Sequence, residues 1–153
     1  MGGVGVRLLL LGLLLATLYV GSLVLFPVEK IQVIGAHHLR PEEVVRTLGL
    51  WEGEPWLWVF PGQARLLLQN PWVREARLEK PRPKEILIRI EERTPIARLA
   101  NGDGLSRDGV ILPKGGKGPL VEGKGPLPTQ AVIALVENFP KAERILYTPA
   151  GFW

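Results

Sequence analysis

The chain has no cysteine among its 153 residues, so it forms no disulfide bond and offers neither a thiolate metal ligand nor a cysteine nucleophile. Histidine and serine are also scarce: the chain has His37, His38, Ser22 and Ser106, and no others. It contains no Gly-x-Ser-x-Gly, no glycine-rich phosphate loop and no His-Glu-x-x-His motif. We therefore expect a protein that is not an enzyme and that uses no cofactor and no small-molecule substrate.

The two histidines lie in the stretch VIGAHHLRPEEVV, close to Glu42 and Glu43. Adjacent side chains in an extended loop diverge, and a closed metal site needs three or four ligands with further support around them. The two glutamates are explained by a helix that begins at Pro41, because negative charge is favourable in the first turn of a helix. We expect a loop between a strand and a helix, with both histidines at the surface and no metal.

Charge is only mildly unbalanced, with 19 Lys and Arg against 15 Asp and Glu, a formal charge of +4 and a pI of about 9.7. The basic residues are scattered among glutamates, whereas a nucleic-acid binder normally gathers them on one face or helix. We expect no nucleic-acid partner, and an anionic cell-envelope surface fits the charge at least as well.

The run Leu8–Phe26 contains 19 residues without a charge. At 1.5 Å per residue such a helix spans roughly 28 Å, close to the hydrocarbon thickness of a bilayer. A cleaved signal peptide is the alternative, but its apolar region is shorter and ends in a small-x-small cleavage site, which ATLYVGSL fits poorly. We expect an uncleaved transmembrane helix over 8–26, a cytoplasmic tail over 1–7 and the larger part of the chain outside.

The segment after the membrane run predicts a short strand and two helices. Ile31 and Val33 alternate before Gly35, RPEEVVRTLG reads as a helix, and FPGQARLLLQNP places Ala64, Leu67 and Leu68 at helical spacing. The linking segment LWEGEPWLWVF holds three of the five tryptophans, Trp51, Trp56 and Trp58. They suit a membrane-interface belt, a ligand platform or a core, and we expect the core.

The segment from Trp72 to Arg93 predicts a hairpin. WVREARLEK places Ala76 and Leu78 on one face, and ILIRIEER places three isoleucines, at 86, 88 and 90, on one face. Strict alternation with one apolar face predicts antiparallel strands that are covered on one side only. The order strand, helix, helix, strand, strand indicates a small α+β layer.

The remaining sequence, 99–153, predicts a hairpin followed by a flexible crossing. GKGPL occurs twice there, and a density of Gly, Lys and Pro of this kind is typical of a segment that is not packed. PTQAVIALVENFP predicts a helix with Val132, Leu135, Val136 and Phe139 on its apolar face. A strand that ends on an apolar edge then indicates a truncated β domain, or one whose sheet another protein completes.

This arrangement resembles the FtsQ/DivIB family of bacterial cell-division proteins, in which a POTRA domain follows a single membrane anchor. The residues that carry the resemblance are IQVIG and NPWVREARLEKPRPKEILIRIEERTPIARL, and GLSRDGVILP resembles the family's next segment, a short strand with an Asp-Gly turn. The resemblance implies an α+β fold: a transmembrane helix, a β-α-α-β-β POTRA domain over 27–98, and the start of a β-rich second domain.

By resemblance, the protein is a bitopic scaffold of the divisome, in the cytoplasmic (inner) membrane at the division septum. It binds other division membrane proteins of the FtsB and FtsL type, and helps to organise septal peptidoglycan synthesis. The alternative is a POTRA-containing envelope protein of outer-membrane assembly or secretion, but such proteins usually carry tandem repeats and a barrel. A periplasmic enzyme and a membrane-tethered nucleic-acid binder are further alternatives that the motifs and the scattered charge do not favour.

The resemblance also points to residues that bind partners. The family's recruiting surface aligns with ARLEKPRP and so with Leu78 and Lys80, although the alternation with Ala76 also places Leu78 in the core. Lys80, at a strand end, is expected to be solvated, so that its replacement by glutamate leaves the stability nearly unchanged. A second surface is expected around the carboxy-terminal segment, at Tyr147, Phe152 and Trp153.

Overall fold

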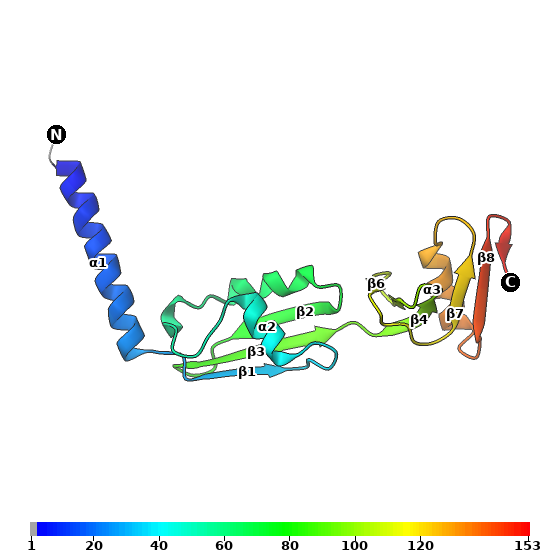
Figure 1. Cartoon of the computed structure of the whole chain (residues 1–153), viewed down its shortest axis with the longest axis horizontal. Coiled ribbons are helices and arrows are strands. Elements are labelled where there is room, and N and C mark those ends of the chain that lie inside the picture. Colours follow the sequence, from blue (N-terminus) through cyan, green and yellow to red (C-terminus); the bar gives the residue numbers. More distant parts are fainter. Residues whose placement is uncertain (1–2) are drawn as a thin grey trace. The chain divides into compact units, whose positions relative to one another are not determined.

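The computed structural model describes residues 3–153 and begins with one long helix, α1 (Gly3–Leu25; Figure 1). Its 23 residues measure about 34 Å at 1.5 Å per residue, slightly more than the hydrocarbon core of a bilayer. The helix is long and apolar enough to cross a membrane. Residues 3–7 of the predicted tail are already helical, and residues 1–2 lie outside the described part of the chain.

The contacts divide the chain into two units. The first contains the residues up to Gln69 together with Glu75–Glu91, and the second contains Asn70–Arg74 together with Glu92–Trp153. Each unit has its own sheet, and the two are described separately below.

The first unit is built on a three-stranded sheet in the order β1-β3-β2, from strands β1 (Lys30–Ile34), β2 (Val73–Glu79) and β3 (Glu85–Glu92). β1 runs parallel to β3, with Ile31 opposite Ile86 and Val33 opposite Ile88. The connection between β2 and β3 is too short for a parallel crossover, which needs a dozen residues or more, so these two strands form the predicted hairpin.

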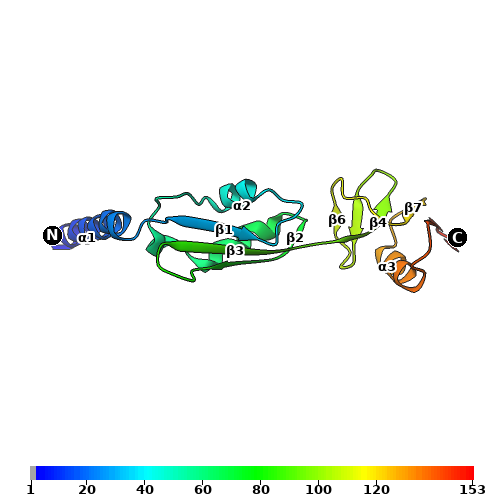
Figure 2. The ribbon, with the colours of Figure 1, turned by 90° about the horizontal axis from the view of Figure 1, so that it is seen from below.

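One face of this sheet is covered by α2 (Pro41–Leu48) and by η2 (Pro61–Gln69), which pack against each other (Figures 1 and 2). The predicted signals for α2 are confirmed: Pro41 opens it, two glutamates lie in its first turn, and Gly49 ends it in the left-handed conformation with φ of 67°.

The second predicted helix differs, because η2 is a 3₁₀ helix. A 3₁₀ helix has three residues per turn, so residues i and i+3 lie above one another. Ala64 and Leu67 are accordingly buried, whereas Leu68 is turned outward and is 49% exposed. The expected apolar stripe was therefore wrong at Leu68. A shorter 3₁₀ turn, η1 (Trp56–Trp58), precedes η2.

The core of the first unit lies between the sheet and this cover. The three isoleucines of β3 form its floor, with exposed fractions of 1% for Ile86, 0% for Ile88 and 6% for Ile90. The predicted alternation along β3 is confirmed. The other buried apolar side chains of this core are Val28, Val44, Leu48, Leu50, Val59, Ala64, Leu67 and Leu78.

The second unit contains a six-stranded sheet in the order β6-β5-β4-β7-β8-β9. Helix α3 (Thr129–Asn138) lies between β7 and β8 in the sequence, and β7, β8 and β4 run parallel to one another. Ala97, Leu105, Val121, Val132, Ile133 and Ile145 form the core. The strands are β4 (Pro95–Leu99), β5 (Gly104–Ser106), β6 (Ile111–Leu112), β7 (Leu120–Gly123), β8 (Arg144–Thr148) and β9 (Gly151–Phe152).

Two predictions for the second unit were wrong. The GKGPL region is not an unpacked crossing, because Leu120–Gly123 form β7 inside the sheet, where Val121 is only 2% exposed. The apolar face of α3 also differs: Ile133 is buried, whereas Phe139 caps the helix with non-helical dihedrals and is 61% exposed.

The glycines of residues 114–118 (KGGKG), in the same predicted crossing, allow close packing rather than flexibility. A Cβ atom on Gly115 would lie 2.6 Å from two ring atoms of Trp72, and one on Gly118, which has φ of 88°, would lie 2.5 Å from the carbonyl oxygen of Ile96. The chain passes these neighbours closely only because no side chain is present.

The start of the second unit is fixed by Arg93 in the motif EERTPIA. Its guanidinium group donates to the carbonyl oxygens of Pro71 and Val73 and pairs with Asp108 at 2.7 Å. Burial alone would raise the pKa of Asp108, but hydrogen bonds from Ser106 and Arg93 bring it below its usual value. Since β4 belongs to this sheet, the predicted domain boundary at residue 98 falls inside β4.

The isoleucine face gives a stability prediction. Ile88→Asp should unfold the first unit, because an unpaired carboxylate would replace a side chain that is 0% exposed, at a cost of about 4 kcal/mol or more. Arg89→Asp is the control, since Arg89 is exposed and loses only a surface ion pair with Glu79, worth under about 1 kcal/mol. Circular-dichroism melts that rank the two variants the other way would contradict this register.

The close approach at Gly115 gives a second prediction. Gly115→Ala should destabilise the second unit by about 1–3 kcal/mol, because the rigid, buried ring of Trp72 has to move to accept the methyl group. Gly62→Ala, in η2, adds a methyl group that meets no atom within 4 Å and should be neutral or slightly stabilising. Thermal melts of both variants test this, and an unchanged melting temperature for Gly115→Ala would show that the ring yields freely.

Candidate interaction surfaces

The tryptophan-rich segment lies against the end of α1. Backbone hydrogen bonds join the segment to the residues that follow the helix: Val28 donates to the carbonyl oxygen of Glu54 at 2.8 Å, and Trp56 donates to that of Phe26 at 2.9 Å. The indole N–H of Trp58 donates to Ser22 Oγ at 3.0 Å, and its ring meets Tyr19 edge-on with 5.9 Å between centroids. The loop therefore packs onto the last two turns of the helix.

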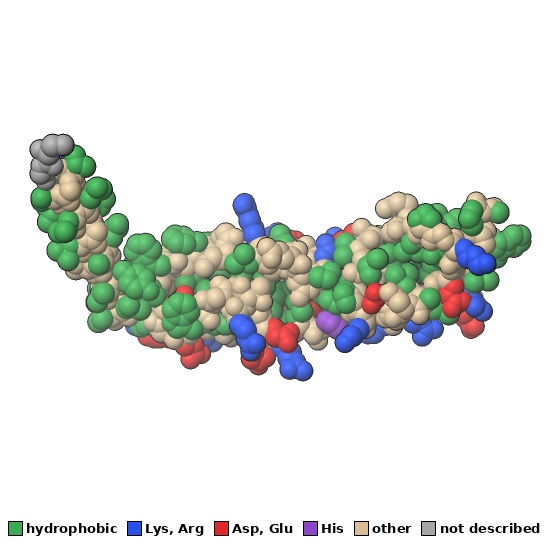
Figure 3. Space-filling view, turned by 45° about the horizontal axis from the view of Figure 1, so that its top comes forward, with side chains coloured by type: hydrophobic (Ala, Val, Ile, Leu, Met, Phe, Trp, Pro, Cys, Tyr) green, Lys and Arg blue, Asp and Glu red, His purple; other side chains and the backbone are tan. Residues whose placement is uncertain are grey.

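The expectation that all three tryptophans fill the core was wrong. Trp51 is 56% exposed and Trp58 is 40% exposed, and only Trp56 is partly buried among the three. Apolar side chains gather around the end of α1 and the adjoining part of the first unit (Figure 3). A tryptophan-rich loop in a small domain is commonly interior, so the surface position of these rings requires another explanation.

Lys80 joins the end of β2 to this loop rather than facing solvent. Its ammonium group donates to the carbonyl oxygens of Trp56 at 2.7 Å and Val59 at 3.0 Å, and it lies 4.0 Å from the centroid of the Trp56 ring. Burial lowers the pKa of Lys80. The expected solvation of this lysine is therefore wrong, because three favourable contacts hold it inward. Its role in partner binding stays a prediction.

Leu78 is 4% exposed and belongs to the core of the first unit. The sequence allowed either a partner-binding or a core position for Leu78. The structure favours the core, because the side chain shares the covered face of the sheet with Ile88. A buried leucine offers no side-chain surface to a partner. Neither residue predicted on this strand therefore presents a free side chain.

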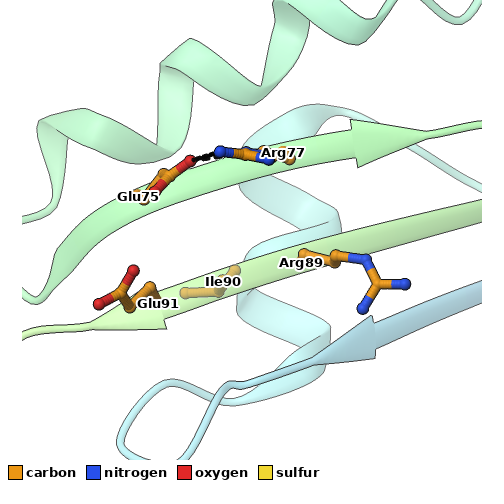
Figure 4. A pocket seen from close by; sticks show the side chains of 5 residues that line it. All are labelled: Glu75, Arg77, Arg89, Ile90 and Glu91. Atoms are coloured by element: carbon orange, nitrogen blue, oxygen red, sulfur yellow. Dashed lines mark hydrogen bonds and ion pairs between the residues drawn. The ribbon is translucent and has the colours of Figure 1, made fainter.

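The uncovered face of the same sheet carries charges of both signs. Figure 4 shows Glu75 and Arg77 on β2 and Arg89 and Glu91 on β3, which line a shallow hollow on this face. Arg77 pairs with Glu75 along its own strand, and Arg89 pairs with Glu79 across the sheet at 3.0 Å. Internal pairing of this kind leaves little net charge to attract a partner.

The edge of the second sheet is different in character. Trp153 and Leu146 exchange two backbone hydrogen bonds, at 2.8 and 2.9 Å, so the next pair, Phe152 with Tyr147, is a non-hydrogen-bonded pair of the antiparallel ladder. The backbone N–H and C=O of Phe152 consequently point away from β8. Within residues 3–153, β9 is the last strand of its sheet and presents an open edge.

Apolar side chains surround this edge. Phe152 is 38% exposed and Trp153 is 81% exposed, and both line a groove that runs between α3 and β8–β9. Tyr147 is half-buried and packs against the second core, so it supports the edge from beneath. The other residues of the groove are Leu135, Phe139, Ala142, Arg144 and Ile145.

Both histidines are exposed, as expected for the loop between β1 and α2. Among residues 3–153, no group of three or more His, Cys, Asp or Glu side chains is arranged to hold a metal ion. The absence of a metal site stays a prediction from the sequence.

Sequence reasoning missed Phe139 as a surface residue and Trp58 as a neighbour of α1. For Phe139 a signal was present, because Pro140 follows it and disfavours a helical conformation for the residue before it. For Trp58 no local signal existed, since its contact with Ser22 joins residues 36 positions apart.

The comparisons agree with the fold of the first unit. Residues 26–93 match the family model of the FtsQ-type POTRA domain. No curated protein matches the chain. This segment holds β1, α2, η2, β2 and β3, so the expected β-α-α-β-β POTRA fold is confirmed, with 3₁₀ geometry in its second helical element. The match supports the resemblance to the FtsQ/DivIB family.

Lys80 gives a prediction that reverses the one made from its position alone. Lys80→Glu should destabilise the first unit by about 2 kcal/mol or more, because a carboxylate would face two carbonyl oxygens that now accept hydrogen bonds. Lys84→Glu is the control, since Lys84 belongs to the same connection between β2 and β3 but its ammonium group pairs with the exposed Glu29. Urea unfolding curves test this, and equal midpoints for the two variants would contradict it.

Proposed function

We propose that the protein is a bitopic membrane scaffold of the bacterial divisome, which binds other division proteins and so helps to organise septal peptidoglycan synthesis. The observation that carries the proposal is the order of two elements: an FtsQ-type POTRA domain begins at residue 26, directly after a helix that is apolar and long enough to span a bilayer. The proposal assigns no catalytic reaction to the chain.

In this proposal α1 is an uncleaved anchor in the cytoplasmic membrane. Its amino-terminal end lies in the cytoplasm, and both units lie outside, because large domains cross the membrane largely regardless of their charge. The helix is followed at once by Pro27 and Val28, which pair with the Glu54–Pro55 segment of the POTRA domain. The anchor therefore leads into folded structure without a long linker.

We place the main partner-binding surface at the β9 edge. A strand from a small membrane protein of the FtsB or FtsL type would pair with the outward N–H and C=O of Phe152, and its apolar side chains would enter the groove beside Trp153. An open edge flanked by exposed aromatic side chains suits this mode, because the backbone supplies affinity and the groove supplies selectivity.

The proposal is tested by imaging a functional fluorescent fusion in dividing cells and by purifying the protein from membranes with its partners. The expected result is enrichment at the division septum and recovery of other division membrane proteins. Uniform distribution around the envelope, with no division protein recovered at normal expression, would overturn the proposal.

The edge itself is tested by Phe152→Pro. Proline removes an N–H group that points away from β8, so the bonds between β8 and β9 remain while strand addition loses a donor. We expect recovery of the partner to fall by about tenfold or more, on the scale of 1.4 kcal/mol per tenfold change.

Phe152→Ala is the matched control, because it removes the same side chain and keeps the N–H group. It should retain more of the partner than Phe152→Pro, and both variants should melt close to the parent. If the proline variant recovers its partners in full, the β9 edge is not the binding surface.

A further inference from the structure

The exposed apolar surface of α1 continues onto the tryptophan-rich loop. At the helix end Val24 is 75% exposed and Leu25 is 66% exposed, and in the loop Trp51, Leu57 and Trp58 are 56%, 48% and 40% exposed. The two groups belong to one unit and are in contact through Trp58, Tyr19 and Ser22. They form one surface, which we call the juxtamembrane patch and define as Val24, Leu25, Trp51, Leu57 and Trp58.

The loop is held rigidly in this position. In addition to the two backbone bonds described above, Gly53 donates to the carbonyl oxygen of Val28 at 2.8 Å. Lys80 fixes the other side of the loop through the carbonyl oxygens of Trp56 and Val59. The patch is therefore preformed, and it needs no rearrangement to meet a binding partner.

The contacts of Trp58 set the depth of the loop along α1. Ser22 lies three residues and Tyr19 six residues before the last residue of the helix, or about 4.5 and 9 Å along its axis. A ring at this level stands beside the last two turns of α1. If the helix spans the membrane, these turns reach the boundary between acyl chains and headgroups, because the helix is only slightly longer than the hydrocarbon core.

The polar groups of the loop are arranged to permit such a position. The indole N–H of Trp58 is satisfied by Ser22, so its ring can enter an apolar region without leaving a donor unpaired. Glu54 is 7% exposed and accepts a hydrogen bond from the backbone of Trp51, which turns its carboxylate inward. Burial raises the pKa of Glu54, although the bond from Trp51 opposes this.

We propose that the juxtamembrane patch inserts into the outer interface of the same bilayer that α1 spans, so that lipid and not protein covers Trp51, Leu57 and Trp58. The proposal rests on the membrane span of the proposed function. The position of the loop decides the occupant: a spanning α1 is surrounded by lipid, and Trp58 lies directly against this helix at Tyr19 and Ser22. Tryptophan is enriched at this level of a membrane, where its large apolar ring lies between the acyl chains and water.

The absence of cysteine makes a direct depth measurement simple, since a single introduced cysteine carries the only label. Spin labels are placed in the full chain at Leu57→Cys and Trp51→Cys, with Leu14→Cys in α1 as the membrane reference and Arg89→Cys as the water reference. Leu14 and Arg89 are both exposed in the structure. Each chain is reconstituted in vesicles of phosphatidylethanolamine and phosphatidylglycerol, and its label is exposed to oxygen or to a water-soluble nickel chelate.

The expected result is that labels at Leu57 and Trp51 are relaxed by oxygen more than by nickel, at values between those of Leu14 and Arg89. Values equal to Arg89, with Leu14 still oxygen-accessible, overturn the inference and leave the membrane anchor standing. Water-like values at Leu14 as well overturn both the anchor and the inference. Labels shielded from both reagents show that protein covers the patch and also overturn it. Thermal melts of the labelled chains confirm that each is folded.

Discussion

The alternation of side chains along β3 is the constraint on which the first unit depends. β3 is the middle strand, so β1 and β2 both take their register from it, and its three isoleucines form the floor of the core. A shift by one residue would bring Arg89 and Glu91 inward and Ile88 outward, so the alternation excludes a slip by one residue. Covering this face requires α2 and η2, and the other face is left to charged residues that pair among themselves.

Features with a local cause were predictable. The period of two in β2 and β3, the proline and glutamates that open α2, and the uncharged run of α1 each depend on residues close together in the sequence. The 3₁₀ geometry of η2 was not predictable, because the spacing of Ala64 and Leu67 fits a helix of three residues per turn as well as one of 3.6. Only the outward position of Leu68 distinguishes the two, and it is seen only in the folded unit, where η2 packs against α2.

Features that depend on contacts between residues far apart in the sequence were predicted wrongly. The glycines of KGGKG suggested flexibility, yet Gly115 is closely packed, since a Cβ atom there would lie 2.6 Å from two ring atoms of Trp72. Lys80 suggested solvent, yet carbonyl oxygens more than 20 positions away in the sequence hold its ammonium group. In both cases residue type indicates the preference of an isolated chain, and packing against a remote segment overrides it.

The two proposed interaction surfaces also have no local sequence pattern that predicts them. One uses backbone groups and the other uses side chains. At β9 the recognising groups are the backbone N–H and C=O of Phe152, whose direction is set by the pairing of Trp153 with Leu146 and not by side-chain identity. In the juxtamembrane patch the side chains matter, but lipid requires only that they are apolar or aromatic and sets no order of residues. Neither surface therefore needs a fixed motif. Each surface is defined by what the fold leaves exposed, which is a backbone edge at β9 and apolar side chains in the juxtamembrane patch. In both, the neighbouring elements hold the exposed groups in place.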